Sequence, residues 1–172
     1  EGASLLWENV DLEERSWKLP DPKNRKPTIF PLSSVAWNIL NDRPRVSEYV
    51  FPGIGAKGYF QDIRSMMGKL SDKVGERLIP SDLRRSFLLA AGEAKIEFVR
   101  CKLLMNHLLS GDVTIHSYMD TENLLWLSED SENIAKWMVR QGRLEKNKIT
   151  DINVARGGIR CFPKTSLNEQ KK

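Results

Sequence analysis

A short stretch rich in proline and positive charge separates two strand-like segments near the start of the chain. The segments cover residues 15–19 and 28–32, and the stretch at 20–27 contains three prolines. Because proline cannot donate a hydrogen bond to a sheet ladder, this stretch is held out of the strands. The pattern predicts an antiparallel β-hairpin with a basic connecting loop. The basic side chains of that loop are Lys23, Arg25 and Lys26.

Apolar residues at helical spacing fill most of the chain after this hairpin. Serines at 33 and 34 are expected to cap the first helix, and Pro80 with Ser81 to start another. The expected inward side chains are Val35, Ile39 and Leu40; Phe60, Ile63, Met67 and Leu70 on a helix over 59–74; Leu83, Phe87, Leu88 and Ala91; Phe98, Cys101, Met105 and Leu108; and Leu125, Ile134, Trp137 and Met138 on a helix over 121–143. Together with a small sheet that begins near Leu5, this order predicts a mostly helical α+β fold, in which a small antiparallel sheet precedes a helical bundle.

Length and charge predict one domain followed by a tail. The chain has 172 residues, of which 40% are hydrophobic and 29% charged, as expected for a single soluble domain. Residues 146–172 carry a net charge of +5, whereas the rest of the chain sums to −1. We therefore expect a domain over 1–145 and a basic tail over 146–172. This balance permits a polyanionic partner, although a solvated, disordered tail is the alternative.

Several classes of protein are disfavoured by the sequence. No apolar run approaches the ~18–20 residues that cross a bilayer, and no cationic and then apolar leader opens the chain. Two cysteines, Cys101 and Cys161, are too few for a disulfide framework or a zinc site. These features predict a protein of the reducing cytoplasm without a membrane span or a metal. Because residue 1 is glutamate, we expect a piece of a longer protein.

Three groups of polar residues stand out from routine packing. Besides the basic loop, Arg84 and Arg85 follow Ser81 in what is expected to be the first turn of a helix. Cations there oppose the helix dipole, so an anion such as phosphate is a plausible ligand. His107 ends a later helix and is followed closely by Tyr118. Each group also has a structural interpretation: arginines form surface ion pairs, histidine caps a helix, and tyrosine packs half-buried.

In this order, the segments resemble the catalytic domain of the tyrosine recombinases, the phage integrase family. The family's opening, an acidic residue and then Leu-x-Trp-x-x-(Val/Ile)-Asp, is similar to EGASLLWENVDL at 1–12. Its basic hairpin, which ends in Pro-Leu-Ser, is similar to KNRKPTIFPLS at 23–33. Its His-x-Leu-Arg-(Arg/His)-Thr-Phe helix start resembles SDLRRSF at 81–87, and its Leu-Leu-Gly-His resembles LLMNH at 103–107. The stretch at 113–118 resembles the helix that carries the nucleophile.

The resemblance implies roles for four catalytic residues. Tyr118 would attack a DNA phosphate, form a 3′-phosphotyrosine and release a 5′-hydroxyl. Arg84 would bind the non-bridging oxygens, Lys23 would protonate the leaving 5′-oxygen, and His107 would steady the transition state. Arg25 and Lys26 would contact DNA. Such a reaction needs positive charge and a proton donor, which arginine and lysine can supply without a metal or other cofactor.

The sequence departs from the family pattern at several positions. The family's first catalytic arginine would lie three residues before Glu1. Ser81 stands where the family has a histidine; serine cannot act as a base near neutral pH, although its hydroxyl can still contact phosphate. Asn106 replaces a glycine, and the interval from His107 to Tyr118 is a residue or two longer than is typical of the family, so that Ser117 also fits one alignment. His116 is interpreted as a surface group, and Arg85 either as a phosphate contact or as an ion-pair partner.

Three hypotheses follow for the function. The first is an integrase-type, site-specific recombinase of the bacterial or phage nucleoid, which acts on double-stranded DNA as a homotetramer and is a monomer as a fragment. In such a tetramer Leu124, Leu125 and Trp126 would contact a neighbour, with a core role as the alternative. The second is a degenerate recombinase fold that binds DNA or protein without cleavage. The third is a helical protein-interaction domain, which predicts that Lys23, Arg84, His107 and Tyr118 lie far apart.

Overall fold

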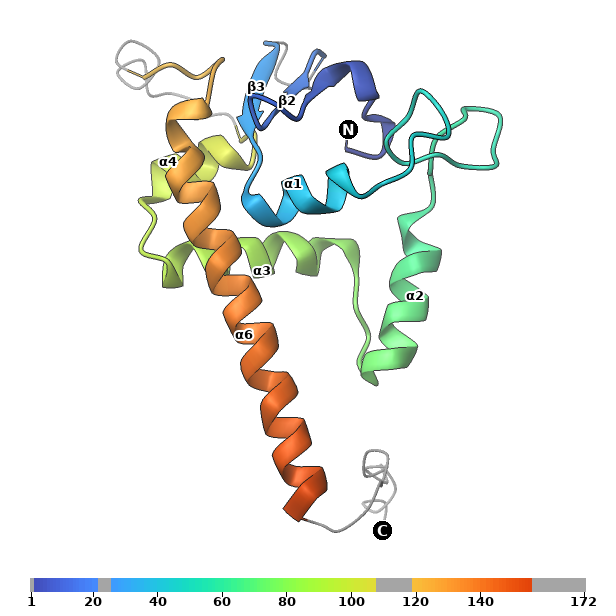
Figure 1. Cartoon of the computed structure of the whole chain (residues 1–172), viewed down its shortest axis with the longest axis vertical. Helices are drawn as coiled ribbons and strands as arrows, with labels where there is room; N and C mark the ends of the chain where they lie inside the picture. The colour runs from blue at the N-terminus through green and yellow to red at the C-terminus, as the bar shows by residue number, and fades with distance from the viewer. Residues whose placement is uncertain (1, 22–25, 108–118, 156–172) are drawn as a thin grey trace, which may run out of the picture. The chain divides into compact units, whose positions relative to one another are not determined.

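The computed structural model describes residues 2–21, 26–107 and 119–155, with side chains as far as residue 143. In this part of the chain a small antiparallel sheet precedes the helices, as predicted (Figure 1). The strands are β1 (Val10–Asp11), β2 (Ser16–Leu19) and β3 (Thr28–Pro31), in the order β1-β2-β3. The α-helices are α1 (Ser34–Asn41), α2 (Ile63–Val74), α3 (Pro80–Glu93), α4 (Phe98–Leu104) and α6 (Ser128–Ala155). Short 3-10 turns are η1 (Gly2–Ser4), η2 (Trp7–Asn9) and η3 (Leu125–Leu127).

The predicted hairpin is confirmed. Strands β2 and β3 pair antiparallel, with Trp17 opposite Phe30, and the two rings stack with their centroids 4.7 Å apart. The sheet does not begin near Leu5, as was expected. The backbone there forms the 3-10 turn η2 and joins the sheet only at Val10 and Asp11 of β1. The hairpin therefore carries most of the sheet and holds its basic loop at one end of β3.

The sheet packs on a cluster of buried side chains that we call the sheet cluster. Its members are Leu19, Phe30, Leu103, Leu124 and Leu127. They come from β2, β3, α4 and the segment before α6, and Leu127 is fully buried. Burying a side chain of this size contributes about 1.5–3 kcal/mol. The sheet cluster thus fixes the end of α4 and the segment before α6 against the hairpin.

A second cluster, the helix cluster, joins α3, α4 and α6 through Ala90, Ala91, Cys101 and Ile134. The small side chains of Ala90 and Ala91 are buried and let the helix backbones approach closely. Burial also raises the pKa of the Cys101 thiol. This packing sets where the beginning of α3 lies relative to the end of α4.

Several apolar side chains that were predicted to face inward are exposed. Leu83 and Leu88 are 51% and 39% exposed, because α3 packs through Phe87, Ala90 and Ala91, a stripe rotated from the predicted one. Phe98 and Met138 are likewise exposed.

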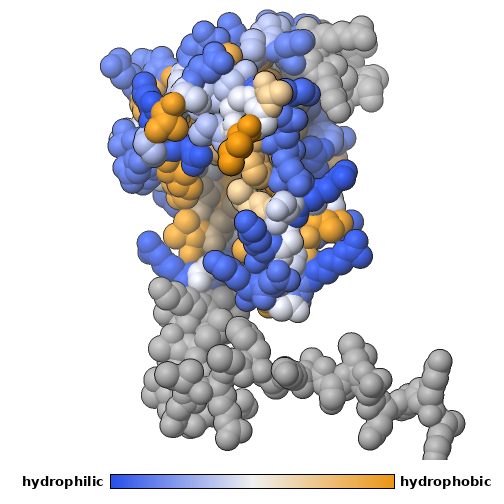
Figure 2. Space-filling view, turned by 90° about the vertical axis from the view of Figure 1, so that its right-hand side faces the viewer, coloured by the Kyte–Doolittle hydropathy of each residue, from blue (hydrophilic) through white to orange (hydrophobic). Residues whose placement is uncertain are grey.

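Helix α2 also differs from the prediction. It begins at Ile63 instead of residue 59, and Met67 is the one buried residue of its apolar face among the residues described. The exposed apolar side chains of α2 are Ile63, Met66, Leu70 and Val74. Figure 2 faces the side on which α2 lies and shows apolar groups interrupting a mainly hydrophilic surface.

Helix α1 starts as predicted, with the Ser33 side chain accepting a hydrogen bond from the Ala36 N–H at 3.3 Å. Its first residue, Ser34, also makes a distant contact. The Ser34 N–H and hydroxyl donate to the two carboxylate oxygens of Glu132 on α6, at 2.7 and 2.8 Å. The hydrogen bond from the Ser34 backbone is the main reason that the pKa of Glu132 is lowered, against a smaller opposing effect of burial.

The last helix begins later than predicted. Residues 121–124 are not helical, and α6 starts only at Ser128, after η3. Leu124 is 1% exposed and belongs to the sheet cluster, so of its two predicted roles the core role is confirmed. The chain separates into two compact units, Glu1–Trp137 and Met138–Lys172, whereas the predicted boundary lies at residue 145. None of the helices in the described ranges is long and apolar enough to span a membrane.

Candidate active site

The beginning of α3 places Arg84 one turn beyond the helix terminus. Pro80 is the first helical residue, and Asp82, the third, accepts a hydrogen bond from the Ile79 N–H at 2.9 Å. Arg84 is the fifth residue, so the expectation that it lies in the first turn is wrong. The negative charge that the helix dipole favours at this end is supplied by Asp82 within the chain. The helix dipole alone is therefore no argument that an external anion such as phosphate binds at the start of α3.

The end of α4 places His107. The His107 N–H donates to the Lys102 carbonyl at 3.0 Å, and the Asn106 N–H donates to the Leu103 carbonyl at 2.9 Å. This is the bond pattern of a Schellman motif, which needs a left-handed residue just beyond the helix. Asn106 occupies that position with a φ of 54°. Asparagine tolerates this region better than most side chains, which explains why it can occupy this left-handed position.

These two helix ends bring Arg84 and His107 into direct contact. The Arg84 Nη1 and His107 Nε2 atoms lie 2.6 Å apart on the exposed surface, although the residues are 23 positions apart in sequence. A guanidinium only donates hydrogen bonds, so in this contact the Arg84 N–H faces His107 Nε2 as the acceptor. A guanidinium has five N–H donors, and this contact uses one. The pair therefore combines a fixed positive charge with a polar ring, as an anion site requires.

Arg85 and Ser81 take different positions on the same helix. Arg85 Nη1 donates to Asp82 Oδ1 at 3.0 Å, which agrees with its interpretation as an ion-pair partner. The Arg85 side chain is 75% exposed, and such a pair contributes little to stability. Ser81 is exposed as the second residue of α3.

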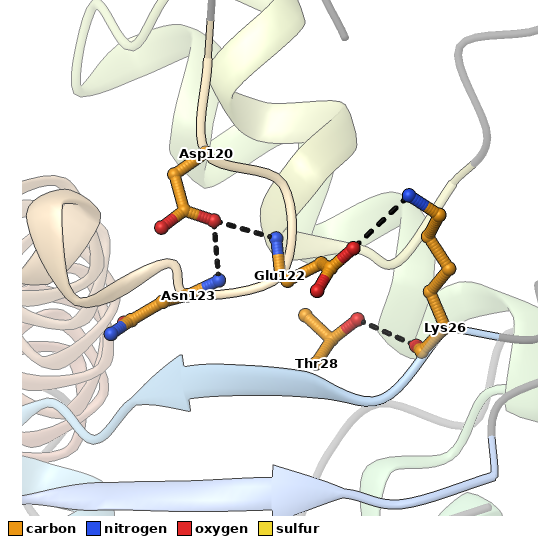
Figure 3. Close-up of polar contacts among 5 residues, drawn as sticks. All are labelled: Lys26, Thr28, Asp120, Glu122 and Asn123. Atoms are coloured by element: carbon orange, nitrogen blue, oxygen red, sulfur yellow. Dashed lines mark hydrogen bonds and ion pairs between the residues drawn. The ribbon is translucent and has the colours of Figure 1, made fainter.

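A third group lies at the start of β3, where the basic loop returns to the sheet (Figure 3). Lys26 Nζ lies 3.0 Å from Glu122 Oε1, and both side chains are more than half exposed. The segment that contains Glu122 runs parallel to β3, with a bridge between Ile29 and Asn123. The Ile29 N–H donates to the Glu122 carbonyl at 2.7 Å, and the Leu124 N–H donates to the Ile29 carbonyl at 2.8 Å. The residues that follow Tyr118 are thus attached to the strand that follows the basic loop.

Three predicted site residues, Lys23, Arg25 and Tyr118, lie outside the described residues. Their described neighbours in sequence are informative. Lys26 begins the return to β3, and Met119 packs against the sheet cluster. The described residues that follow the predicted acid and the predicted nucleophile in sequence, Lys26 and Met119, therefore both lie near β3.

The fold has a counterpart among solved structures. The integrase from mycobacterium phage Brujita superposes with a TM-score of 0.57 at 24% sequence identity, over 78% of this chain and 45% of that chain. This chain has an integrase-like fold. It spans less than half the length of the phage integrase it matches. Neither a protein-family model nor a curated protein matches the sequence.

Near this site the structure shows one residue, Asp120, that the sequence patterns did not single out. Asp120 Oδ1 accepts hydrogen bonds from the N–H groups of Glu122 and Asn123 at 2.9 and 2.8 Å, and so turns the chain toward β3 (Figure 3). The available signal was the Asp-Thr-Glu-Asn sequence at 120–123, which is typical of an Asx turn. A helix was predicted there instead, because the apolar residues after it have helical spacing.

Other places for a ligand do not coincide with these residues. A hollow of about 800 Å³ lies beside α2, and its lining runs from Arg64 to Pro80. Of the predicted site residues that are described, none lines it. Within the same ranges, no group of three or more histidine, cysteine, aspartate or glutamate side chains is placed to hold a metal ion.

Proposed function

We propose that this chain is the catalytic domain of a site-specific DNA recombinase that cuts and rejoins DNA through a 3′-phosphotyrosine at Tyr118. The observation that carries the proposal is the 2.6 Å contact between Arg84 and His107, two residues chosen from sequence as phosphate ligands. The integrase-like fold supports it, as does the attachment to β3 of the residues after Tyr118. The contact also argues against a helical interaction domain, which predicts that this pair is far apart.

The proposed reaction is an in-line displacement at phosphorus. The Tyr118 phenol gives its proton to solvent, its oxygen forms a bond to the phosphorus of a DNA phosphodiester, and the bond from phosphorus to the 5′-oxygen breaks. Lys23 donates its proton to that leaving oxygen. In rejoining, a 5′-hydroxyl gives its proton to Lys23 and attacks the phosphotyrosine, and Tyr118 leaves and is reprotonated from solvent. The energy of the phosphodiester is therefore kept and no nucleotide is consumed.

Positive charge stabilises the transition state of this reaction. Charge builds up on the non-bridging oxygens as Tyr118 attacks, and Arg84 is proposed to bind them with the N–H groups that face away from His107. His107 would donate or share a hydrogen bond at the same oxygens. A phosphate that binds here exchanges the contact between Arg84 and His107 for contacts from each residue to oxygen.

Partners, domains and location follow from the same proposal. The substrate is double-stranded DNA, which Arg25 and Lys26 contact through its backbone, and the active assembly is a homotetramer on two duplexes. Ser81 and Arg85 remain proposed phosphate contacts, with Arg85 first required to leave Asp82. The domain is proposed to cover residues 1–145, with 146–172 as a basic tail, in a protein of the bacterial or phage nucleoid.

The test is capture of the covalent intermediate. The full encoded protein is incubated with a nicked suicide substrate that contains its recombination site, and the protein–DNA adduct is measured on a denaturing gel. We expect the adduct with the wild type and its loss in Tyr118→Phe. Tyr59→Phe is the matched control, because it removes a phenol from the loop after α1 and should leave the adduct intact.

A degenerate fold that binds DNA or protein without cleavage is the second candidate, and Ser81 favours it. In the family this position holds a histidine, and the serine hydroxyl cannot accept the phenol proton near neutral pH. An adduct that depends on Tyr118 would reject this candidate. Binding of site DNA without any adduct would favour it over the recombinase.

A further inference from the structure

The segment that follows Tyr118 is held to the protein by more than its pairing with β3. Asp120 stands two residues after Tyr118, and its carbonyl oxygen accepts a hydrogen bond from the indole Nε1 of Trp126 at 3.0 Å. The Asp120 carboxylate also accepts hydrogen bonds from the N–H groups of Glu122 and Asn123. Trp126 therefore closes a loop of seven residues, 120–126, and fixes the carbonyl of the first.

Trp126 is itself held in place from α4. The guanidinium carbon of Arg100 lies 5.3 Å from the centre of the Trp126 ring, within the range of a cation–π interaction. Trp126 is 39% exposed, so the ring does not owe its position to deep burial. Its orientation instead depends on the arginine beneath it and on the hydrogen bond to Asp120.

Arg100 is in turn anchored on a buried carboxylate. Its Nη1 atom donates to Asp130 Oδ1 at 3.2 Å and lies 3.1 Å from Asp130 Oδ2. Asp130 is 6% exposed, and burial raises its pKa, although Arg100 acts in the opposite direction. Because both carboxylate oxygens lie within 3.2 Å of the Arg100 Nη1 atom, the buried carboxylate determines where the guanidinium lies. Contacts thus run without a break from α6 through Arg100 and Trp126 to Asp120.

We propose that Trp126 is a positioning residue for the nucleophile, and that Arg100 and Asp130 hold it in the orientation that this requires. The inference rests on the proposed role of Tyr118. Tyr118 is joined to Asp120 through Met119 alone, so the position of the Asp120 backbone limits where the phenol can reach. Displacements of about 1 Å at a reacting group can cost about 10²-fold in rate. Trp126 acts through the backbone and does not touch the substrate.

Trp126→Phe is the variant that tests this, because it keeps an aromatic ring over Arg100 and removes the N–H that binds Asp120. The protein offers a closely matched control in Trp37. Its Nε1 donates to the Leu12 carbonyl at 2.8 Å, and the guanidinium carbon of Arg15 lies 5.3 Å from its ring centre. Trp37→Phe therefore removes the same kind of bond from the same kind of pair, on α1.

Single-turnover adduct formation and DNA affinity are measured on the full encoded protein. We expect Trp126→Phe to lower the adduct rate about tenfold or more while DNA affinity changes less than about twofold, and Trp37→Phe to change neither. Equal rates for wild type and Trp126→Phe would overturn the inference. Equal rate losses in both variants would also overturn it, because both would then report general stability.

Hydrogen exchange separates this inference from the proposed function. The amides of Ile29 and Leu124 pair the segment with β3, and we expect both to lose protection in Trp126→Phe and to keep it in Trp37→Phe. Unchanged protection would overturn the positioning role even if cleavage is observed. If the wild type forms no adduct, the proposed function fails, and the nucleophile-positioning role fails with it.

Discussion

The contact between Glu132 and the start of α1 gives the most sharply defined test of the fold. Each carboxylate oxygen accepts one hydrogen bond from Ser34, at 2.7 Å from the N–H and 2.8 Å from the hydroxyl. The perturbation is Glu132→Gln, which keeps the shape of the side chain and removes its charge. The amide oxygen can still accept from the Ser34 N–H, and the amide N–H₂ can face the hydroxyl oxygen. The variant therefore isolates the charge.

The size of the effect follows from these two bonds. A hydrogen bond to a charged group contributes about 1.5–3 kcal/mol, against about 0.5–1.5 kcal/mol for a neutral one. The Glu132 side chain is 25% exposed, which screens part of the difference. The carboxylate also lies at the beginning of α1, where a negative charge is worth about 0.3–1 kcal/mol. We expect Glu132→Gln to lower the free energy of unfolding by about 1–2 kcal/mol at neutral pH.

The pH dependence gives this effect a sign that can be checked. Because the pKa of Glu132 is lowered in the folded protein, its contribution is present above the ordinary value of 4.5. The contribution is lost as the pH falls through the folded pKa, since the folded carboxylate binds fewer protons than the unfolded one. Wild type and variant should therefore differ at pH 7 and converge near pH 3 in urea unfolding.

The control is Glu129→Gln, which removes a charge from an exposed position on the same helix and should cost less than about 0.5 kcal/mol. A difference between wild type and Glu132→Gln that is the same at both pH values would refute the role of the charge. An equal cost for the control would show that the net charge of α6 matters rather than the contact with Ser34.

Three further predictions concern the site and the loop after α1. Arg84→Ala should slow adduct formation about 10²–10³-fold with a much smaller loss of DNA affinity; matching losses would make Arg84 a binding residue alone. Lys23→Ala should slow cleavage strongly with an ordinary 5′-oxygen leaving group and much less with a better one, and equal slowing on both substrates would contradict its role as the acid. Gly53→Ala should lower the thermal midpoint of unfolding, because the new Cβ would overlap the Tyr59 carbonyl. Gly55→Ala should leave the midpoint nearly unchanged, since the nearest atom to its Cβ is the end of the flexible Gln61 side chain at 3.3 Å. A larger loss for Gly55→Ala than for Gly53→Ala would refute this packing.

The sequence was sufficient wherever structure depends on neighbouring residues. The prolines of the basic loop and the period of the flanking strands predicted the hairpin from Ser16 to Pro31, and the Ser33 cap predicted the start of α1. The resemblance to the integrase family pointed to Arg84 and His107, and the fold brings these two side chains to 2.6 Å from each other. The hairpin and the helix cap are encoded locally, in backbone preferences and side-chain chemistry that need no partner from elsewhere in the chain.

Only the tertiary structure decided features that depend on distant backbone groups. Apolar spacing predicted a helix from residue 121, but the Ile29 N–H and carbonyl pair with the backbone of Glu122 and Leu124 and keep that segment extended. The bond between Ser34 and Glu132 likewise joins residues 98 positions apart. Periodicity reports which face of an element is apolar, and it does not report which partner will cover that face or compete for its hydrogen bonds. For that reason the sequence indicated residue types suited to the site, whereas the contacts that link Asp130 to Asp120 through Arg100 and Trp126 could not be predicted from it.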